Sequence, residues 1–365
     1  MKFPRMLLFA ATVAPLLLVS QGNREQEDKR FAEIKAKHDK GETVTAEERE
    51  FAQSVMERRN QSKSAERNAS WAKDHPPQES VGKIPLSDPG SDGMYPNGQS
   101  TPPAAHLKAG MALSRQIVPL DQDGKRANDG KIVLITIGMS NTTQESRLFQ
   151  KLAEERKSEL NPRLVIVDGA QGAQTAAITA KPDSNYWKVA EGRLKEAGVT
   201  ANQIQAAWLK QANAGPKEPF PAEAKKLQAD LVETVHNLHD KYPNLKLVFL
   251  SSRIYGGYAS SPLNPEPHAY ETGFAVKWLI ADQIAGKPEL NSDPKKGAVR
   301  APWLAWGPYL WADGMKGRKD GLLWAREDLG PDGTHPSMQG REKVGRLLVD
   351  FFTKNEVTRP WFMKR

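Results

Sequence analysis

The sequence predicts a three-layer α/β/α domain around a mostly parallel sheet, preceded by a charged helical extension. Two observations predict this class. Short apolar runs rich in Val and Ile alternate with longer amphipathic stretches, and strands that alternate with helices form βαβ units with parallel strands. These runs all lie after about residue 106, whereas the preceding part of the chain is dense in charged, Pro and Gly residues. The fold is therefore expected in the C-terminal part of the chain.

Four short apolar runs are expected to be strands, at residues 132–137, 164–167, 204–209 and 245–250. Amphipathic patterns predict five helices, at residues 144–160, 186–197, 222–241, 271–285 and 339–354. In an open parallel sheet of this flavodoxin-like kind, ligands bind beyond the carboxyl ends of the strands. Functional residues are therefore expected just after each strand.

The chain begins with the pattern of a secretory signal peptide, predicted at residues 1–22. Lys2 and Arg5 precede an apolar run, residues 6–19, which is followed by small and polar residues. This run is too short to span a bilayer comfortably, although an N-terminal membrane anchor is the alternative. The pattern predicts export to the periplasm or the extracellular space of a bacterial envelope, with no transmembrane segment after cleavage.

Residues 23–78 are predicted to be a charged helical extension or spacer. Thr45 and Glu48 form a capping-box pattern, and Phe51 and Val55 follow one turn apart. A helical hairpin docked on the main domain and a solvated spacer both fit this pattern. Residues 79–105 are rich in Pro, Gly and Ser and predict a linker, and the main domain is expected at residues 106–365.

Composition narrows the classes of function. The 365 residues include no cysteine, which excludes disulfides, a thiol nucleophile and a lipid-anchored cysteine. A net charge of +8 favours an anionic partner such as an envelope polymer. Nucleic acid is the usual partner of a basic chain, but predicted export and the lack of a nucleic-acid-binding motif argue against it. No pattern of metal ligands stands out, so neither a metal nor another cofactor is predicted.

The first predicted strand ends in Ile137-Gly138-Met139-Ser140-Asn141. A serine in the turn between a strand and a helix can present its hydroxyl as a nucleophile and its N–H to an oxyanion. The simpler interpretation is that Ser140 caps the following helix. Thr142 stands where the nucleophile elbow of α/β-hydrolases requires glycine, so that elbow is not predicted.

Three further segments lie after the other strands or before the last helix. Gly172 lies in a glycine-containing turn after the second strand, and Asn213 follows the third. Asp332 and His335 form an Asp-x-x-His pattern before the last helix, in which the carboxylate can orient the imidazole as a general base. Each motif alone also has a purely structural interpretation: a tight turn for Gly172 and a backbone-bonded loop amide for Asn213.

Taken together and in this order, these motifs resemble the blocks of the SGNH (GDSL-like) hydrolase superfamily over residues 131–352. The Gly-x-Ser-Asn form of the first block is similar to the sialate O-acetylesterase branch. The resemblance implies that Ser140 is the nucleophile, His335 the general base and Asp332 its orienting acid. It also implies an oxyanion hole formed by Ser140, Gly172 and Asn213, without a cofactor.

The chain departs from the family pattern at two blocks. Gln211 and Ala214 flank Asn213 where the family usually has Gly and Asp, and Ala173 replaces an Asp after Gly172. The resemblance therefore implies a secreted serine esterase, expected to deacetylate a carbohydrate. The alternative is a non-catalytic glycan-binding or envelope-scaffold protein on the same fold.

Three further residues are weaker candidates for substrate contacts. Arg253 follows the fourth strand and could pair with an anionic group. Trp306 and Trp311 belong to an aromatic-rich segment before Asp332, and their rings could stack on a sugar. The alternative for both tryptophans is that they pack the segment onto the sheet.

Overall fold

The computed structural model describes residues 21–39, 45, 47, 48, 51, 52, 54, 55 and 93–364. The chain divides into two compact units, Met1–Glu66 and Arg67–Arg365. Residues 1–20 of the predicted signal peptide and residues 79–92 of the predicted linker lie outside the described residues. None of the described helices is both long and apolar enough to cross a membrane.

The N-terminal unit contains the helix α1 (Gln21–Asp39), and residues 47, 48, 51, 52, 54 and 55 are also helical. The predicted capping box is present, because the N–H of Thr45 donates to the Glu48 carboxylate and the N–H of Glu48 donates to Thr45 Oγ1. The Arg30 guanidinium lies 4.3 Å from the ring centre of Phe51. The described residues of the charged extension are therefore helical, apart from Thr45, which precedes the second helical segment.

The second unit is built on a five-stranded sheet in the order β2-β1-β3-β4-β5, with all pairs parallel. The strands are β1 (Ile132–Gly138), β2 (Leu164–Asp168), β3 (Ile204–Lys210), β4 (Leu247–Leu250) and β5 (Trp303–Trp306). The first four confirm the predicted strands to within two residues at each end. The sequence did not predict β5, which lies in the aromatic-rich segment.

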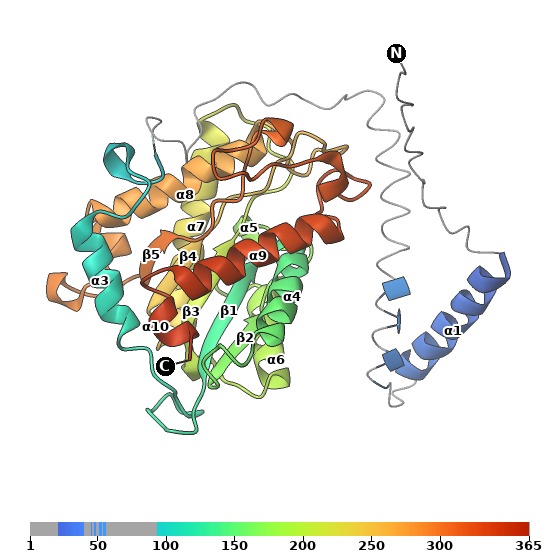
Figure 1. Cartoon of the computed structure of the whole chain (residues 1–365), viewed down its shortest axis with the longest axis horizontal. Helices are drawn as coiled ribbons and strands as arrows, with labels where there is room; N and C mark the ends of the chain where they lie inside the picture. The colour runs from blue at the N-terminus through green and yellow to red at the C-terminus, as the bar shows by residue number, and fades with distance from the viewer. Residues whose placement is uncertain are drawn as a thin grey trace, which may run out of the picture. The chain divides into compact units, whose positions relative to one another are not determined.

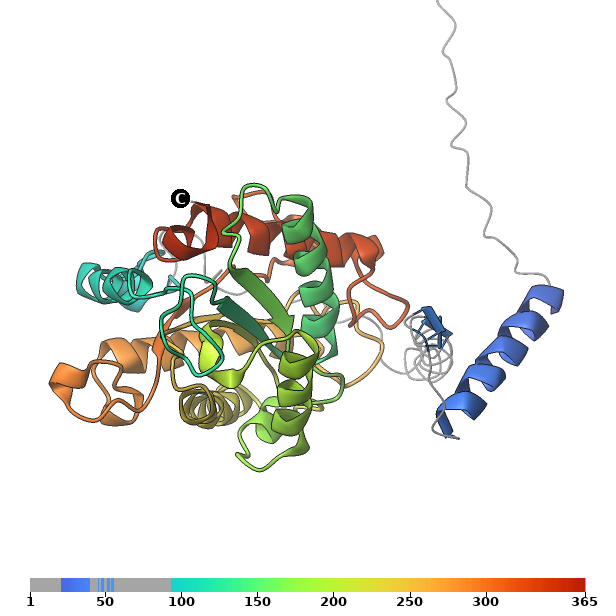
Figure 2. The same cartoon turned by 90° about the horizontal axis from the view of Figure 1, so that it is seen from below.

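Helices cover both faces of this sheet, which confirms the predicted three-layer class (Figures 1 and 2). On one face α4 (Ser140–Glu155) packs against α9 (Met338–Lys354). On the other face lie α6 (Asn185–Glu196), α7 (Ala222–Lys241) and α8 (His268–Ile284). The remaining α-helices are α3 (Ala104–Ser114), α5 (Ala176–Thr179) and α10 (Arg359–Phe362). Short 3₁₀ turns occupy Pro96–Gly98, Ala201–Gln203, Pro288–Leu290, Pro294–Lys296, Gly314–Lys316 and Arg326–Asp328.

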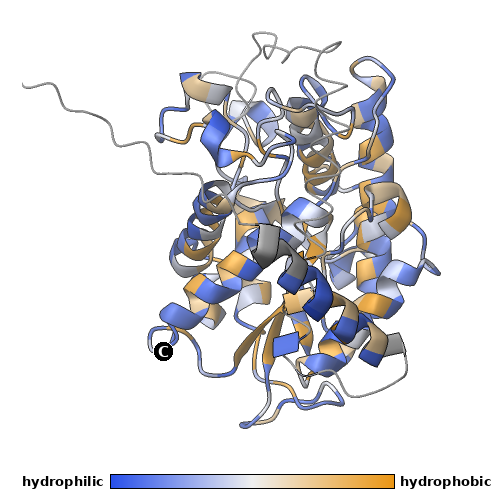
Figure 3. Cartoon of the chain, turned by 90° about the vertical axis from the view of Figure 1, so that its right-hand side faces the viewer, coloured by the Kyte–Doolittle hydropathy of each residue, from blue (hydrophilic) through white to orange (hydrophobic). Residues whose placement is uncertain are grey.

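The strands read as nearly continuous apolar runs because helices shield both faces of the sheet. Every residue of β1, β3, β4 and β5 is buried, whereas the edge strand β2 is mostly half-buried. Figure 3 shows hydrophobic colouring on the strands and mixed colouring on the helices. The core therefore lies between the sheet and the inner faces of its helices.

The end of the predicted linker is part of this folded unit. Tyr95 is 3% exposed, and its hydroxyl accepts a hydrogen bond from the backbone N–H of Trp306. The Trp306 indole donates to the carbonyl of Met94. Residues 93–105 thus differ from the expected linker, since they contact the edge strand β5 and lead into α3.

The strand order places a topological switch point between β1 and β3. The chain leaves β1 through α4 on one face of the sheet, and it leaves β3 toward α7 on the other face (Figure 2). The two connections diverge at the carboxyl ends of these strands, which is where α/β proteins commonly bind ligands. Ser140 and Asn213 follow these two strands.

Candidate active site

The turn after β1 holds Ser140 at the first position of α4. Gly138 is required here, because a Cβ atom would lie 2.2 Å from Thr142 Oγ1 and 2.3 Å from the carbonyl oxygen of Lys210. Thr142 Oγ1 donates to that same carbonyl, which fixes the start of α4 against the end of β3. As the first helical residue, Ser140 has a backbone N–H without an acceptor inside the helix.

Ser140, His335 and Asp332 form a continuous chain of hydrogen bonds. Ser140 Oγ lies 2.7 Å from His335 Nε2, and His335 Nδ1 lies 2.5 Å from Asp332 Oδ2. Ser140 and His335 are half-buried, while Asp332 is 9% exposed. The structure therefore brings together three residues that the sequence predicted as a set. The Ser140 and His335 side chains are partly accessible to solvent, whereas the Asp332 carboxylate is more deeply buried.

The Asp332 carboxylate organises the turn that carries the histidine. Its Oδ1 accepts the backbone N–H of Thr334 at 3.1 Å and that of His335 at 3.0 Å. Burial alone raises the pKa of Asp332, but the hydrogen bonds from His335 and from these N–H groups outweigh it and lower the pKa below its usual value. The carboxylate is therefore ionised at neutral pH and holds the imidazole with Nδ1–H directed at Oδ2.

Glycine is also required at position 333. Gly333 has φ +63°, and a Cβ atom there would lie 1.7 Å from the carbonyl oxygen of Tyr258. Tyr258 belongs to the loop that follows β4. In the same loop, the backbone N–H and the hydroxyl of Ser260 both donate to the carbonyl of Asp332. The loop after β4 therefore packs directly on the Asp332–His335 turn.

Asn141 connects the two halves of the site and was not singled out from the sequence. Its Nδ2 donates to the carbonyl of Thr334 at 2.9 Å, and the side chain is 1% exposed. This bond ties the residue after Ser140 to the residue before His335. The only sequence signal was its place beside the serine, which does not indicate a partner 193 residues away.

Gly172 faces Ser140. A Cβ atom built on Gly172 would meet nothing nearer than Ser140 Cβ, at 4.0 Å, so the space between the two residues is open. The N–H of Gln171 donates to the carbonyl of Gly138, which holds this turn beside the end of β1. Ala173 follows with φ +61°, a conformation that L-residues other than Asn and Asp rarely adopt.

Asn213 lies after β3, but its side chain has other partners. Its Oδ1 accepts the backbone N–H of Ala177 at 3.0 Å, and its Nδ2 donates to Asp230 at 2.6 Å. One of the two amide hydrogens is therefore bonded to Asp230 rather than directed at an oxyanion. Asn213 is flanked by Gln211 and Ala214, where the family pattern has Gly and Asp. The sequence thus departs from that pattern at the same place where the Asn213 side chain has these other partners.

Arg253 lies in the loop that follows β4 and is 4% exposed. Its backbone N–H donates to Thr272 Oγ1, and its guanidinium attracts the carboxylates of Glu145, Asp332 and Glu266 electrostatically. Its Nε has no hydrogen-bond partner among the described residues. The guanidinium is therefore a buried counter-charge close to the Asp332 carboxylate.

The two tryptophans predicted as sugar contacts are buried. Trp306 and Trp311 are 3% and 4% exposed, and the Trp311 indole donates to Glu266 at 2.7 Å. These positions favour the packing interpretation, because a ring this deeply buried has no free face for a sugar. The aromatic-rich segment supplies β5 and the residues around it.

A buried ion pair lies behind the turn that carries Ser140. The Lys210 ammonium, at the end of β3, lies 2.5 and 2.6 Å from the two carboxylate oxygens of Glu145 in α4. The two side chains are 1% and 0% exposed. Burial lowers the pKa of Lys210 to about 8 and raises the pKa of Glu145, whereas their mutual attraction opposes both shifts. This pair joins the helix that begins with Ser140 to the central sheet.

The described residues contain no group of three or more His, Cys, Asp or Glu side chains arranged to hold a metal ion. A hydroxyl bonded to an imidazole that is itself bonded to a carboxylate can act as a nucleophile.

No protein-family model and no curated protein matches the chain. Two solved structures align with it at 12% sequence identity and a TM-score of 0.35. One is the periplasmic domain of a lipopolysaccharide acetyltransferase of Salmonella ser. Paratyphi A, for which the alignment covers 67% of this chain and 95% of that chain. The other is the protein YxiM of Bacillus subtilis, with 63% of this chain and 59% of that chain covered.

Proposed function

We propose that the protein is a serine ester hydrolase in which Ser140 is the nucleophile, His335 the general base and Asp332 the orienting acid. The observation that carries this proposal is the unbroken hydrogen-bond chain from Ser140 Oγ through His335 to Asp332. The 2.7 Å between Ser140 Oγ and His335 Nε2 is within the reach that proton transfer requires.

In the proposed reaction, His335 Nε2 takes the Ser140 hydroxyl proton as Oγ bonds to the ester carbonyl carbon. The negative charge moves to the carbonyl oxygen, and the N–H groups of Ser140 and Gly172 are the proposed donors to it. The tetrahedral intermediate then expels the alcohol, which takes the proton from His335. Water repeats the sequence on the acyl-enzyme with His335 as base, releasing the acid and restoring Ser140.

Asn213 is the proposed third oxyanion donor, through the amide hydrogen that does not bond Asp230. Arg253 is 4% exposed and its Nε is buried, so its proposed role is to stabilise the nearby carboxylates electrostatically rather than to contact the substrate as the sequence predicted. The substrate class proposed from predicted export is an acetylated carbohydrate of the bacterial envelope or its surroundings.

The test is hydrolysis of 4-nitrophenyl acetate together with labelling by a fluorophosphonate probe. Ser140→Ala is expected to lower kcat by about 10³-fold or more and to abolish labelling. Ser158→Ala, an exposed serine beyond α4, is the matched control and is expected to retain both. Unchanged turnover in Ser140→Ala would refute the role of this serine.

One observation favours a second function, a non-catalytic glycan-binding or scaffold protein on the same fold. The side chain of Asn213 is bonded to Asp230 and to Ala177, which differs from a free oxyanion donor. That alternative predicts no probe labelling of the wild-type protein together with saturable binding of a polysaccharide. Labelling at Ser140 excludes it.

A further inference from the structure

Most of the exposed apolar side chains lie on connections at one edge of the sheet. The large apolar side chains that the described residues expose are Val189, Phe220, Leu263, Met315 and Met338. Phe220 lies in the connection after β3 and Leu263 in the connection after β4. Met315 lies in the connection after β5, and Met338 is the residue at which that connection enters α9. Because all strand pairs are parallel, these connections leave the carboxyl edge of the sheet, which also carries Ser140.

The loop that carries Phe220 is held in place by a buried carboxylate. Glu223 Oε1 accepts the backbone N–H groups of Lys217 and Glu218 at 2.9 and 3.2 Å. Burial raises the pKa of Glu223, but these hydrogen bonds outweigh it and lower the pKa below its usual value. The carboxylate is therefore ionised at neutral pH, and its bonds fix the backbone shortly before Phe220.

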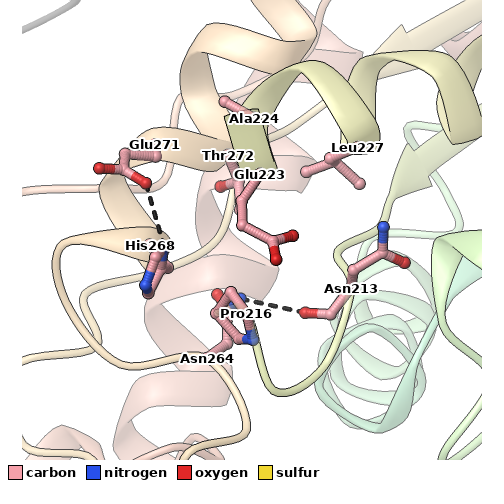
Figure 4. A pocket seen from close by; sticks show the side chains of 9 residues that line it. All are labelled: Asn213, Pro216, Glu223, Ala224, Leu227, Asn264, His268, Glu271 and Thr272. Atoms are coloured by element: carbon pink, nitrogen blue, oxygen red, sulfur yellow. Dashed lines mark hydrogen bonds and ion pairs between the residues drawn. The ribbon is translucent and has the colours of Figure 1, made fainter. Parts of the chain in front are cut away.

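The loop after β4 is joined to this loop. The N–H of Gly215 donates to the carbonyl of Leu263 at 3.0 Å. Figure 4 shows the two loops meeting at Pro216 and Asn264, which line one small pocket together with the starts of α7 and α8. Phe220 and Leu263 are 43% and 42% exposed. The fold therefore holds both side chains at the surface on loops that are bonded to each other.

Aromatic rings extend the apolar surface from Phe220 onto α8. The centre of the Phe220 ring lies 5.1 Å from that of Phe274 and 5.8 Å from that of Trp278. Both of these α8 rings are half-buried. The Lys225 ammonium lies 3.9 Å from the centre of the Trp278 ring. Phenylalanine and tryptophan beside lysine are typical of protein surfaces that lie at the boundary between lipid and water.

Lysines accompany this apolar surface. Lys217, Lys225 and Lys226 are exposed, whereas Glu218 is the one exposed carboxylate within residues 214–226. The positive excess attracts an anionic surface. A lysine can lay its aliphatic stem along apolar groups while its ammonium reaches a headgroup phosphate. The charge of this surface therefore complements that of an anionic membrane.

The arrangement favours a lipid surface over a folded protein or a sugar. A stable protein interface buries about 800 Å² on each partner, whereas the exposed apolar residues here are few and lie on separate connections. A sugar stacks on a free aromatic face, but the Lys225 ammonium lies over the Trp278 ring. Side chains that enter a fluid interface one by one need no partner of matching shape.

We propose that this surface docks on a membrane that contains anionic lipids. Its residues are the apolar Phe220, Leu263, Phe274 and Trp278 and the exposed Lys217, Lys225 and Lys226. Phe220 and Leu263 enter the outer part of the acyl-chain region, and the lysines pair with headgroup phosphates. This docking turns the carboxyl edge of the sheet toward the membrane. The inference does not rest on the proposed esterase function.

The first test measures co-sedimentation with vesicles of phosphatidylcholine and with vesicles of an equal mixture of phosphatidylcholine and phosphatidylglycerol. We expect the wild type to bind the mixed vesicles, and to bind them less at high salt. Phe220→Ser and Leu263→Ser are each expected to lower the partition coefficient by about tenfold, because each removes a side chain that lipid would bury. Val189→Ser, at an exposed position on α6, is the control and is expected to keep wild-type binding.

A pair of lysine substitutions tests the electrostatic part. Lys217→Gln combined with Lys226→Gln is expected to lower the partition coefficient for the mixed vesicles by about tenfold. Lys151→Gln combined with Lys188→Gln removes two exposed lysines of α4 and α6 and is the matched control. An equal loss in both double variants would mean that only the overall charge matters, and it would overturn docking by this surface.

The second test uses the absence of cysteine from the chain, which allows one introduced thiol to be labelled alone. Leu263→Cys that carries the fluorophore NBD is expected to brighten and shift to shorter wavelength when mixed vesicles are added. Val189→Cys with the same label is expected to stay unchanged. Equal responses at the two positions would refute insertion by the loop after β4.

Three further results would overturn the proposal. The first is a wild type that does not sediment with the mixed vesicles. The second is sedimentation that Phe220→Ser and Leu263→Ser leave unchanged and that soluble dextran sulfate abolishes, which would assign the lysines to an anionic polymer. The third is dimerisation without vesicles that Phe220→Ser abolishes, which would assign the surface to a second copy of the chain.

Discussion

Replacing Lys210 by methionine leaves the Glu145 carboxylate without the ammonium group that contacts both of its oxygens. Breaking a fully buried ion pair on one side typically costs about 3–5 kcal/mol. Protonation limits this loss. Protonating a glutamate with an ordinary pKa of 4.5 at pH 7 costs about 3.4 kcal/mol of free energy, because each pH unit above the pKa adds about 1.4 kcal/mol. The buried carboxylate can therefore become neutral at this cost, which sets an upper limit on the loss of stability. We therefore expect Lys210→Met to lower the free energy of unfolding by about 3 kcal/mol at pH 7.

The same reasoning predicts a strong pH dependence for this variant. Without Lys210, burial raises the pKa of Glu145 above its unfolded value, so the variant is relatively stable below about pH 4.5 and loses stability as the pH rises. The deficit relative to the wild type is expected to shrink to about 1 kcal/mol at pH 5. Urea denaturation at the two pH values measures it.

Two controls separate this effect from a loss of packing. Glu145→Leu combined with Lys210→Met removes both charges and is expected to recover most of the stability at pH 7. Lys195→Met, which removes the exposed pair with Glu191, is expected to cost less than about 1 kcal/mol at either pH. A deficit in Lys210→Met that is equal at pH 5 and pH 7 would show that the buried carboxylate is not its cause.

Three further changes test the geometry of the site. Asp332→Asn is expected to lower kcat/KM for 4-nitrophenyl acetate by about 10³–10⁴-fold, since the amide cannot hold His335 in the same tautomer; comparable turnover to wild type would contradict this. Because the pKa of Asp332 is lower in the folded state, its ionised carboxylate stabilises the wild type above about pH 4, and this stability is lost as the pH falls through the folded pKa. Asp332→Asn has no such carboxylate, so its free energy of unfolding is expected to lack this loss when urea titrations at pH 3 and pH 6 are compared. Gly333→Ala is expected to lower the free energy of unfolding by at least about 2 kcal/mol, since its Cβ would overlap the carbonyl of Tyr258, and a neutral result would mean that this loop moves freely. Ala173→Gly is expected to raise it by about 0.5 kcal/mol or more through relief of the positive φ, and a drop would refute that strain.

The parts of the fold that follow from local pattern were predictable. Each central strand is an apolar run bounded by turn residues, and α7 was predicted with the bounds that the structure has. The strand β5 was missed because Trp303-Leu304-Ala305-Trp306 is short and lies among aromatic residues that could equally pack a loop. The helix α3 was missed because its start lies in a Pro-rich stretch that predicts a linker.

The meeting of Ser140 with His335 could be inferred only from the order of motifs. Which partners the remaining polar residues choose depends on tertiary contacts that no local spacing encodes. Lys210 stands at the end of an apolar strand and pairs with Glu145, 65 residues earlier. Asn213 bonds Asp230 and Ala177, and its flanking residues signalled a departure from the family pattern without indicating those partners.

The packing of α9 on α4 has a consequence for how the protein acquires its chemistry. The hydroxyl comes from the first strand–helix connection and the imidazole from the turn before the last long helix, 195 residues later. A chain truncated before Asp332 keeps the nucleophile turn but lacks its proton acceptor. In the proposed esterase, ester turnover therefore requires that the C-terminal helix has docked, and a stopped-flow trace of product release during refolding would time that docking.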